Sequence, residues 1–439
     1  MKLSLAMIVR DEAQNLGACL DSAKDLVDEM IIVDTGSVDK TMEIAASHGA
    51  SVERFAWTGN FAEARNKSLS LCTGDWILAL DADELLNTEE HQIIRQAILD
   101  PSAIGYKLCI RNYLNSGSLF GPGGTAKLND GTFEPSASCS HYIAQQSLRL
   151  FRRQDSPIYI GRVHESVEQW FKEHGHKATL LNATIHHFGK IDSRRDLDKQ
   201  PIYLDLAKRE AEDHPNDPIA HGNVLQEALM LEDWLTVLES ARTYLKLKGG
   251  APALVYLGGA KALVSTGKPD EALEFLAPID NGAEPDPAVL ELKAEALQEL
   301  GRLQEAVDTC LLSIDADPNY TASFIRLAKI FDDDGDTENA RRILEAGLDQ
   351  NARDQKLWEF LVGMSAKRKD ARVAQDAWHA IQAVPKGGQG IWHMLVAQVL
   401  NSQGDLEEAV HVLNLGLAAF PDNLEIMETR KKIAGADRI

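Results

Sequence analysis

Residues 76–84 read WILALDADE, an apolar run that leads directly into three carboxylates. The run predicts a buried strand, and successive side chains of a strand point to opposite faces. Asp81 and Asp83 therefore project the same way at the end of this strand, and Ala82 points back toward the protein. Two hard oxygen ligands in this arrangement suit one Mg²⁺ or Mn²⁺, with water and substrate phosphates completing its shell. A turn or a helix cap is the competing interpretation of the same carboxylates.

The flanking sequence alternates between apolar runs and helical stretches, which favours a mostly parallel sheet with helices on both faces. The other candidate strands are residues 3–9 (LSLAMIV), 30–33 (MIIV) and 51–55 (SVERF). Sheets of this kind bind ligands at the carboxyl ends of their strands. Arg10 and Asp34 directly follow the first two strands, so we expect them to lie near Asp81.

Composition limits the possible functions. At 439 residues the chain is too long for one average domain, and two or three compact units are expected. The formal net charge of −22 argues against nucleic acid and anionic membrane surfaces as partners. No run approaches the roughly 18 apolar residues of a spanning helix, and residues 3–9 lack a cleavage site, so we expect no transmembrane segment and a cytoplasmic chain. The five cysteines are odd in number and never closely paired, as is typical of reduced thiols.

A period of about 34 residues organises the second half. Gly267, Gly301 and Gly335 are 34 residues apart, and Gly404 follows Gly335 by 69, which is one repeat of 34 and one of 35. An alanine stands five residues after each glycine, Lys369 with Ala374 fills the skipped repeat, and prolines close several units: Ala272, Ala306, Ala340, Ala409, Pro318, Pro385 and Pro421. Glycine permits the reversal between two helices, and alanine permits their close approach. A helical hairpin of this length is a tetratricopeptide repeat.

Residues 3–100 resemble a family 2 glycosyltransferase with the nucleotide-diphospho-sugar fold. Four blocks keep the order and spacing of that family: SLAMIVRDEAQNLGACLDS, IIVDTGSVDKT, FAWTGNFAEARNKSL and TGDWILALDADE. The later segments LRLFR, GRVHE and IHHFG (148–152, 161–165 and 185–189) are similar to the branch in which repeats follow this domain. That branch includes enzymes resembling the sublancin-type peptide S-glycosyltransferases and others that build lipopolysaccharide core or cell-envelope glycans. Only residues 112–145 show no family pattern.

The resemblance and the period together predict an α/β domain followed by an all-α domain. Residues 1–195 would form the catalytic domain, with the mixed, mostly parallel sheet of the GT-A fold, and residues 196–215 a connecting helix. Residues 216–435 would form an α-solenoid of six tetratricopeptide hairpins, because Asp233, one period before Gly267, indicates a degenerate first unit. The tryptophans Trp234, Trp358, Trp378 and Trp392 stand at helical spacing, which favours the helix-helix core over surface anchors.

The resemblance also implies roles for single residues. Arg10 and Asp34 would line the nucleotide site, with Asp34 accepting a hydrogen bond from the edge of the base. Arg65 would reach the base or the diphosphate, although a structural ion pair is its competing role. Asp81 would contact the ribose, or the metal through water, and Asp83 would be the direct metal ligand.

An inverting transfer needs a base that removes the proton of the acceptor, and the family has a carboxylate after the acceptor loop. Glu165 is the candidate base, and an ion pair with Arg162 or Arg149 is the competing interpretation.

Histidines are candidates for a third metal ligand, as in some relatives with this fold. His164, His186 and His187 are available, and neighbours in a strand face opposite sides, so only one of the adjacent pair can face the site. We favour His187.

Residues 112–145 are rich in glycine, serine and asparagine and contain few apolar anchors. This composition predicts a long loop with glycine hinges, which we expect to be a flap over donor and acceptor, with plain disorder as the alternative.

The sequence thus predicts an inverting, metal-dependent glycosyltransferase that uses a nucleoside-diphosphate sugar, UDP-linked, with Mn²⁺ or Mg²⁺. The acceptor would be a peptide, a protein or an envelope glycan, and the repeats would recognise a partner, dimerise or brace the catalytic half. Two other classes stay open: a tetratricopeptide scaffold with a vestigial sugar-nucleotide domain, and a metal-dependent hydrolase or phosphotransferase that uses the paired aspartates.

Overall fold

A computed structural model describes residues 1–118, 120–121, 124–155, 157–189, 193–280, 285–368, 390–421 and 423–435. Contacts divide the chain into two compact units, Met1–Asn112 with Ala144–Thr266, and Tyr113–Ile143 with Gly267–Ile439. Lys369, Ala374, Trp378 and Pro385, on which part of the repeat prediction rests, lie outside the described residues, as does the side chain of Trp392.

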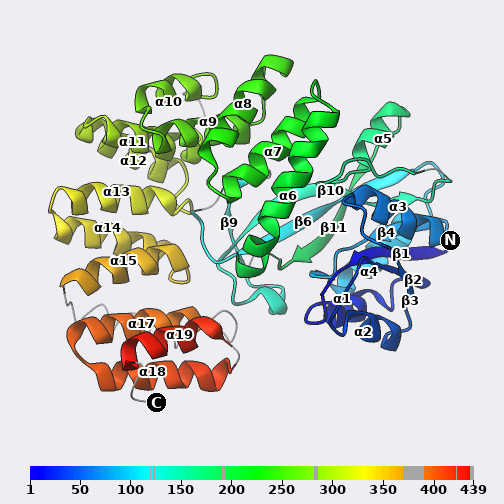
Figure 1. Cartoon of the computed structure of the whole chain (residues 1–439), viewed down its shortest axis with the longest axis horizontal. Helices are drawn as coiled ribbons and strands as arrows, with labels where there is room; N and C mark the ends of the chain where they lie inside the picture. Colours follow the sequence, from blue (N-terminus) through cyan, green and yellow to red (C-terminus); the bar gives the residue numbers. More distant parts are fainter. Residues whose placement is uncertain are drawn as a thin grey trace. The chain divides into compact units, whose positions relative to one another are not determined.

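The N-terminal half of the chain is built around a mixed β-sheet (Figure 1). Its strand order is β3-β2-β1-β4-β10-β6-β11-β5, with β9 paired to β10. The strands are β1 (Leu3–Val9), β2 (Glu29–Asp34), β3 (Ser51–Arg54), β4 (Trp76–Ala79), β5 (Glu84–Leu86), β6 (Gly105–Leu114), β9 (Lys127–Leu128), β10 (His141–Arg152) and β11 (Thr179–His187). β1, β2, β3 and β4 run parallel, β11 is parallel to β6, and β10 and β5 pair antiparallel with β4 and β11.

Alternating side chains of the central strands fill two cores, one on each face of the sheet. In β1, Leu5 and Met7 enter the core formed with α1 (Leu16–Ala23), α2 (Thr41–Ser47) and α4 (Thr88–Ala97). Ala6 enters the opposite core, formed with α3 (Phe61–Leu71) and α5 (Glu168–Glu173). Because successive side chains of a strand alternate between the two faces, a strand buried on both faces is apolar at every position. This explains the continuous apolar runs of the sequence.

Helices α6 (Ser193–Asp213), α7 (Pro218–Met230), α8 (Trp234–Lys248) and α9 (Ala253–Ser265) complete the first unit. Between α7 and α8 the left-handed turn residue is Glu232, with φ +53°, and Asp233 caps α8 by accepting the N–H of Thr236. The turn of this first hairpin therefore falls one residue before the position that the 34-residue period marked.

The second unit consists of helical hairpins that follow one another along the chain (Figure 1). Its described helices are α10 (Pro269–Leu276), α11 (Pro287–Glu299), α12 (Leu303–Ala316), α13 (Ala322–Asp333), α14 (Thr337–Gln350), α15 (Gln355–Arg368), α17 (Gly390–Gln403), α18 (Leu406–Ala419) and α19 (Leu424–Ala434). The four periodic glycines have φ values of +71° to +87°, which glycine adopts without strain. The four periodic alanines are fully buried. The predicted fold class, α/β followed by a helical repeat array, is confirmed.

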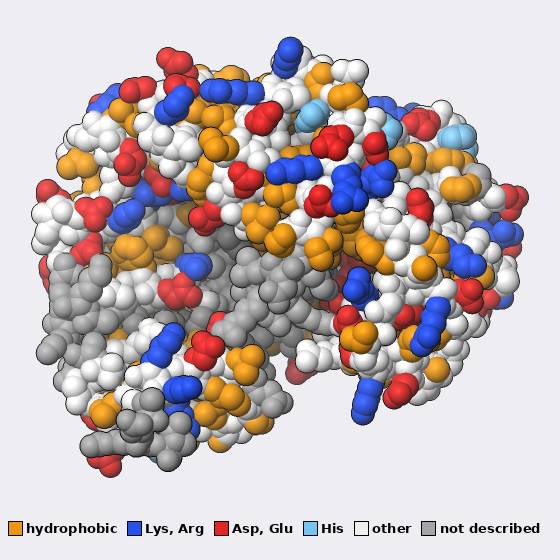
Figure 2. Space-filling model, viewed as in Figure 1, with side chains coloured by type: hydrophobic (Ala, Val, Ile, Leu, Met, Phe, Trp, Pro, Cys, Tyr) orange, Lys and Arg blue, Asp and Glu red, His pale blue; other side chains and the backbone are white. Residues whose placement is uncertain are grey.

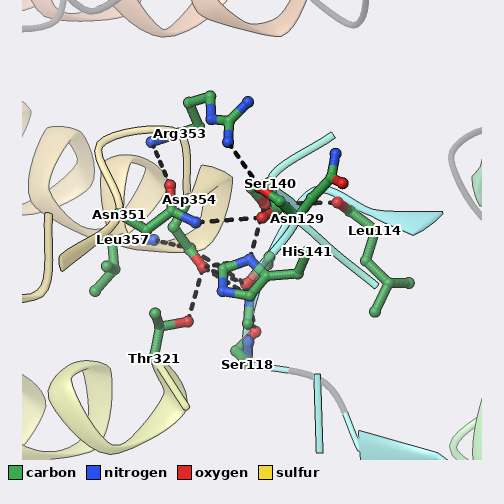
Figure 3. A network of polar contacts seen from close by, with 12 residues as sticks. Leu114, Ser118, Asn129, Ser140, His141, Thr321, Asn351, Arg353, Asp354 and Leu357 are labelled. Atoms are coloured by element: carbon green, nitrogen blue, oxygen red, sulfur yellow. Dashed lines mark hydrogen bonds and ion pairs between the residues drawn. The ribbon is translucent and has the colours of Figure 1, made fainter. Parts of the chain in front are cut away.

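Of residues 112–145, which we expected to form a flap over donor and acceptor, Tyr113–Ile143 belong to the same compact unit as the repeats. They include β7 (Phe120–Gly121), β8 (Gly124–Thr125), β9 and a 3-10 turn at Glu134–Ser136. Figure 3 shows the polar network that holds them around Asp354, a fully buried residue at the start of α15. Asp354 accepts the N–H of Gly117 at 2.7 Å and the hydroxyls of Ser116 at 3.2 Å and Thr321 at 2.8 Å. Hydrogen bonds to the repeats thus satisfy backbone groups that a free flap would leave to water.

On the face drawn in Figure 2, acidic and basic side chains of the described residues are interspersed with hydrophobic ones. Within the described parts of the chain, no helix is both long enough and apolar enough to cross a membrane.

Candidate functional site

A pocket of about 1100 Å³ lies at the carboxyl ends of the parallel strands of the first unit. Six of the seven residues predicted for the site line it: Arg10, Arg65, Asp81, Asp83, Glu165 and His187. Asp34, the seventh, is buried, and its neighbour Thr35 is part of the lining. The local cause is the topology, because β1, β2 and β4 are parallel neighbours whose carboxyl ends meet at one edge.

Asp34 is the last residue of β2, and one of its two carboxylate oxygens accepts hydrogen bonds while the other has no partner among the described residues. Its Oδ1 accepts the N–H groups of Gly36 and Ser37, both at 3.0 Å, which fixes the turn after the strand. Its Oδ2 is buried and has no hydrogen-bond partner among the described residues. A buried acceptor of this kind is costly unless a ligand supplies the donor.

Arg65 and Arg149 hold the carboxylate of Asp81 from two sides. Arg65, from α3, donates to Oδ1 at 2.5 Å, and Arg149, from β10, donates to Oδ2 at 3.1 Å. Burial alone would raise the pKa of Asp81, but the two guanidinium groups outweigh it and hold the pKa well below its ordinary range. Arg149 also donates to Glu84 at 2.8 Å, and burial together with the Asp81 charge raises the pKa of Glu84 to about 7, although Arg149 lowers it.

Glu165, the predicted base, lies against the same arginine. Its Oε1 accepts from Arg65 Nε at 2.7 Å, and only 11% of its side chain is exposed. The expected competing pairs are not the observed ones, because Arg162 binds Asp213 at 2.7 Å and Arg149 binds Asp81, which follows β4, and Glu84 of β5. Glu165 thus lines the pocket and pairs with Arg65. The sequence analysis named this partner neither for Glu165 as a base nor for Glu165 in a structural ion pair.

His187, the last residue of β11, lies with Nε2 3.3 Å from Asp83 Oδ2. Burial lowers the pKa of His187, but the hydrogen bond with Asp83 and its charge outweigh this effect and raise the pKa. His186 points to the other side of the strand, where it is buried outside the pocket lining. His164 lines the pocket with φ +52°, and its imidazole is held by Glu227 at 2.6 Å.

The donor set available for a cation is small. Among the described residues, no cluster of three or more His, Cys, Asp or Glu side chains is arranged to hold a metal ion. Both oxygens of Asp81 accept from arginines, which leaves Asp83 and His187 as two side chains facing one space. One carboxylate and one imidazole fit Mn²⁺, and fit Mg²⁺ less well, provided that water and a diphosphate complete the coordination.

Several residues of the pocket escaped the sequence analysis. An aromatic wall combines Trp57 and Phe61 with Tyr203 of α6, and its ring centroids lie 4.6 and 5.7 Å apart along the series. No sequence pattern joins these three positions. Arg149 stood in a quoted block, but nothing in the sequence indicated that it would bind Asp81.

Comparisons with known proteins identify two stretches of the chain. Residues 4–156 match the family model for glycosyl transferase family 2, and residues 257–321 match a tetratricopeptide repeat model. A TPR repeat-containing protein of Synechococcus elongatus is 48% identical over 105 residues, which are 24% of this chain and 26% of that protein. An uncharacterized glycosyltransferase of Rickettsia felis is 41% identical over 88 residues, 20% of this chain and 31% of that protein. The SPbeta prophage-derived glycosyltransferase SunS of Bacillus subtilis is 35% identical over 89 residues, 20% of this chain and 21% of that protein.

Solved structures that resemble the chain are repeat proteins. A tetratricopeptide repeat protein from Parabacteroides merdae has 14% identity and a TM-score of 0.36, over 55% of this chain and 96% of that chain. The chain spans less than a third of the length of each of the three curated relatives. The family-model matches place a family 2 glycosyltransferase domain at residues 4–156 and a tetratricopeptide repeat at residues 257–321.

Proposed function

We propose that this protein is an inverting glycosyltransferase that moves a sugar from a nucleoside diphosphate, UDP, to a peptide, protein or envelope-glycan acceptor in the cytoplasm, with Mn²⁺ or Mg²⁺. Residues 1–195 would be the catalytic domain, and the repeats would bind a partner or dimerise. One observation carries the proposal: six of the seven predicted site residues, from distant segments, line a single pocket, and four of them (Arg10, Arg65, Asp81 and Asp83) lie within the stretch that matches family 2.

Two unpaired polar atoms support binding of the nucleotide at this site. Asp34 Oδ2 is a buried acceptor and Arg65 Nη1 is a buried donor, and neither has a hydrogen-bond partner among the described residues. A uracil edge offers an N–H to the first, and a carbonyl or phosphate oxygen suits the second. Arg10 lines the same pocket with a half-exposed side chain that can add positive charge near the diphosphate.

Asp83 and His187 are the residues that would hold the cation. When bound, a divalent cation neutralises the negative charge that develops on a leaving diphosphate. Asp81 would then act through its arginines, keeping the guanidinium groups aligned beside the donor.

Glu165 is the proposed base. The acceptor hydroxyl or thiol would attack the anomeric carbon as the bond from that carbon to the diphosphate oxygen breaks, and Glu165 would take the acceptor proton. The pocket volume of about 1100 Å³ leaves space for an acceptor group beside a nucleotide sugar.

The test is a thermal-shift titration with UDP-, GDP- and dTDP-sugars, with and without Mn²⁺, on the wild type and on Asp83→Ala. A ligand at 100 times its Kd stabilises the folded state by about 2.7 kcal/mol, which raises the Tm of a domain of this size by roughly 5–10 °C. We expect a Mn²⁺-dependent shift with one donor and its loss in Asp83→Ala, whose fold should persist because the residue lies at a strand end and is partly exposed.

Asp100→Ala is the matched control, because Asp100 is an exposed carboxylate outside the pocket whose side chain accepts from Ser102. It should respond to the donor like the wild type. An unchanged donor affinity in Asp83→Ala would remove the metal assignment. The absence of any shift in the wild type would favour the scaffold function instead.

A further inference from the structure

The imidazole of His187 is held at both of its nitrogens. Nδ1 lies 2.7 Å from Oδ1 of Asn112, and Nε2 lies 3.3 Å from Oδ2 of Asp83. An amide oxygen can only accept, so Nδ1 carries a proton and Nε2 is the nitrogen presented to Asp83.

The sheet fixes this contact. β6 and β11 are parallel neighbours with Asn112 opposite His187, and on its other side His187 is opposite Glu84 of β5. Asn112 is buried, with 8% of its surface exposed. The backbone ladder therefore determines the place of the amide, and the imidazole cannot rotate without losing its partner.

A glycine keeps the space before these groups open. A Cβ built on Gly189 would collide with Asp83 Oδ2 and would lie 2.7 Å from His187 Nε2. The φ of Gly189 is not in the left-handed region, so its backbone is open to alanine and only the added atom is excluded. Asp83 and His187, the two potential ligands, both face the space that this atom would fill.

We propose that Asn112 is a positioning residue for the cation of the diphosphate donor. It holds the Nδ1 proton of His187 so that Nε2 and the Asp83 carboxylate face one space, which Gly189 leaves clear. This inference rests on the proposed function, because it concerns the same cation. Through Asn112, strand β6 would contribute to the site, which none of the quoted sequence blocks indicated.

The experiment compares Asn112→Leu, which has a similar size but no acceptor, with Asn112→Asp, which restores an acceptor at the same place. The first readout uses the metal-free protein. The ¹⁵N shifts of labelled histidine report which ring nitrogen is protonated, and His187→Gln identifies the signal among the 13 histidines. The second readout is the affinity for Mn²⁺ in the presence of UDP, measured by electron paramagnetic resonance.

We expect Nδ1 of His187 to carry a proton in the wild type and in Asn112→Asp, and to lose this preference in Asn112→Leu, where the Asp83 carboxylate favours the proton on Nε2. Loss of such an outer partner typically weakens metal binding about 10–100-fold. Asn112→Leu should fall in that range, and Asn112→Asp should stay within a few-fold of the wild type. Asn87→Ala, which removes an asparagine that caps α4 outside the pocket, should bind Mn²⁺ normally.

Gly189→Ala tests the open space independently and covers the case in which Asn112→Leu fails to fold. It should keep the proton on Nδ1 of His187 and lose Mn²⁺ binding. The inference is overturned if Asn112→Leu and Gly189→Ala bind Mn²⁺ like the wild type, or if Asn112→Asp binds no better than Asn112→Leu. If the wild type itself binds no Mn²⁺ with UDP, the proposed function fails first and the inference fails with it.

Discussion

Arg65 bridges two carboxylates for which we predicted different duties. Its Nη2 binds Asp81 and its Nε binds Glu165. One buried guanidinium therefore orients both the carboxylate expected near the nucleotide and the proposed base. The sequence could predict that Asp81 and Asp83 lie together at the end of β4, but strand alternation was the wrong reason, because β4 ends at Ala79 and residues 82–83 form a turn in which the Glu84 N–H donates to the Asp81 carbonyl. It could not predict that Arg65 and Arg149 would take both oxygens of Asp81, because that pairing depends on how α3 and β10 pack against β4.

Replacing Glu165 with glutamine separates binding from transfer. The amide keeps the size of the side chain and still accepts from Arg65 Nε, but it cannot take a proton. We expect Glu165→Gln to bind the donor within a few-fold of the wild type and to lose about 100-fold or more of its turnover. Calorimetric donor titration and a transfer assay on an identified acceptor measure the two effects, and retained turnover would move the base to another residue.

Glu29, at the opposite end of β2 from the pocket, makes stability depend on pH. Burial raises its pKa, but hydrogen bonds from Lys2, Ser4 and Thr73 outweigh this and lower the pKa from 4.5 to about 2. A depressed pKa stabilises the folded state above about pH 4.5, and this contribution is lost as the pH falls through about 2. Glu29→Gln should therefore reduce the free energy of unfolding by about 1–3 kcal/mol at neutral pH.

Urea denaturation at pH 7 and pH 3 measures this difference, which should shrink at the lower pH. Glu53→Gln is the control, because that carboxylate is half-exposed and has only a 3.7 Å contact with Lys67. A Glu29→Gln difference that grows toward acid would contradict the assignment.

Among the helices and strands, the repeats could be predicted because their signal lies within each hairpin. The glycine at the turn and the alanine five residues later can be found directly in the sequence. In the structure the glycines form left-handed turns and the alanines are buried contacts. Residues 113–143 could not be predicted this way. Their glycine-rich composition is typical of a loop, and the residue that anchors them, Asp354, stands 238 residues after Ser116.

Asp354 should decide whether the segment 113–143 stays docked. In Asp354→Ala, the Gly117 N–H and the Ser116 and Thr321 hydroxyls lose their acceptor inside a buried network, so we expect a loss of about 2–4 kcal/mol. Hydrogen exchange should quicken at residues 115–118 by tenfold or more. Asp349→Ala, a change of an exposed carboxylate on α14, should leave this exchange unaltered. Unaltered exchange in Asp354→Ala would show that other contacts hold the segment.

The chain has two compact units, each with hydrophobic clusters of its own, and this division predicts its thermal unfolding. Two compact units with separate cores unfold together only if their coupling is strong. We expect a calorimetric enthalpy larger than the van't Hoff enthalpy, with UDP and Mn²⁺ raising one component. Glu29→Gln should lower that same component, and Asp354→Ala should lower the other. One transition that all these changes shift as a whole would contradict the prediction.

The course of the chain between its units limits how such a protein can change by gene rearrangement. The backbone leaves the first unit after Asn112, returns at Ala144 and leaves again after Thr266. A recombination that replaced the repeats at a single junction after Thr266 would keep residues 113–143 and discard Asp354 and Arg353, to which they bind. A foreign repeat array acquired in one step would therefore leave residues 113–143 without these partners, and we expect this segment and the repeats to diverge together.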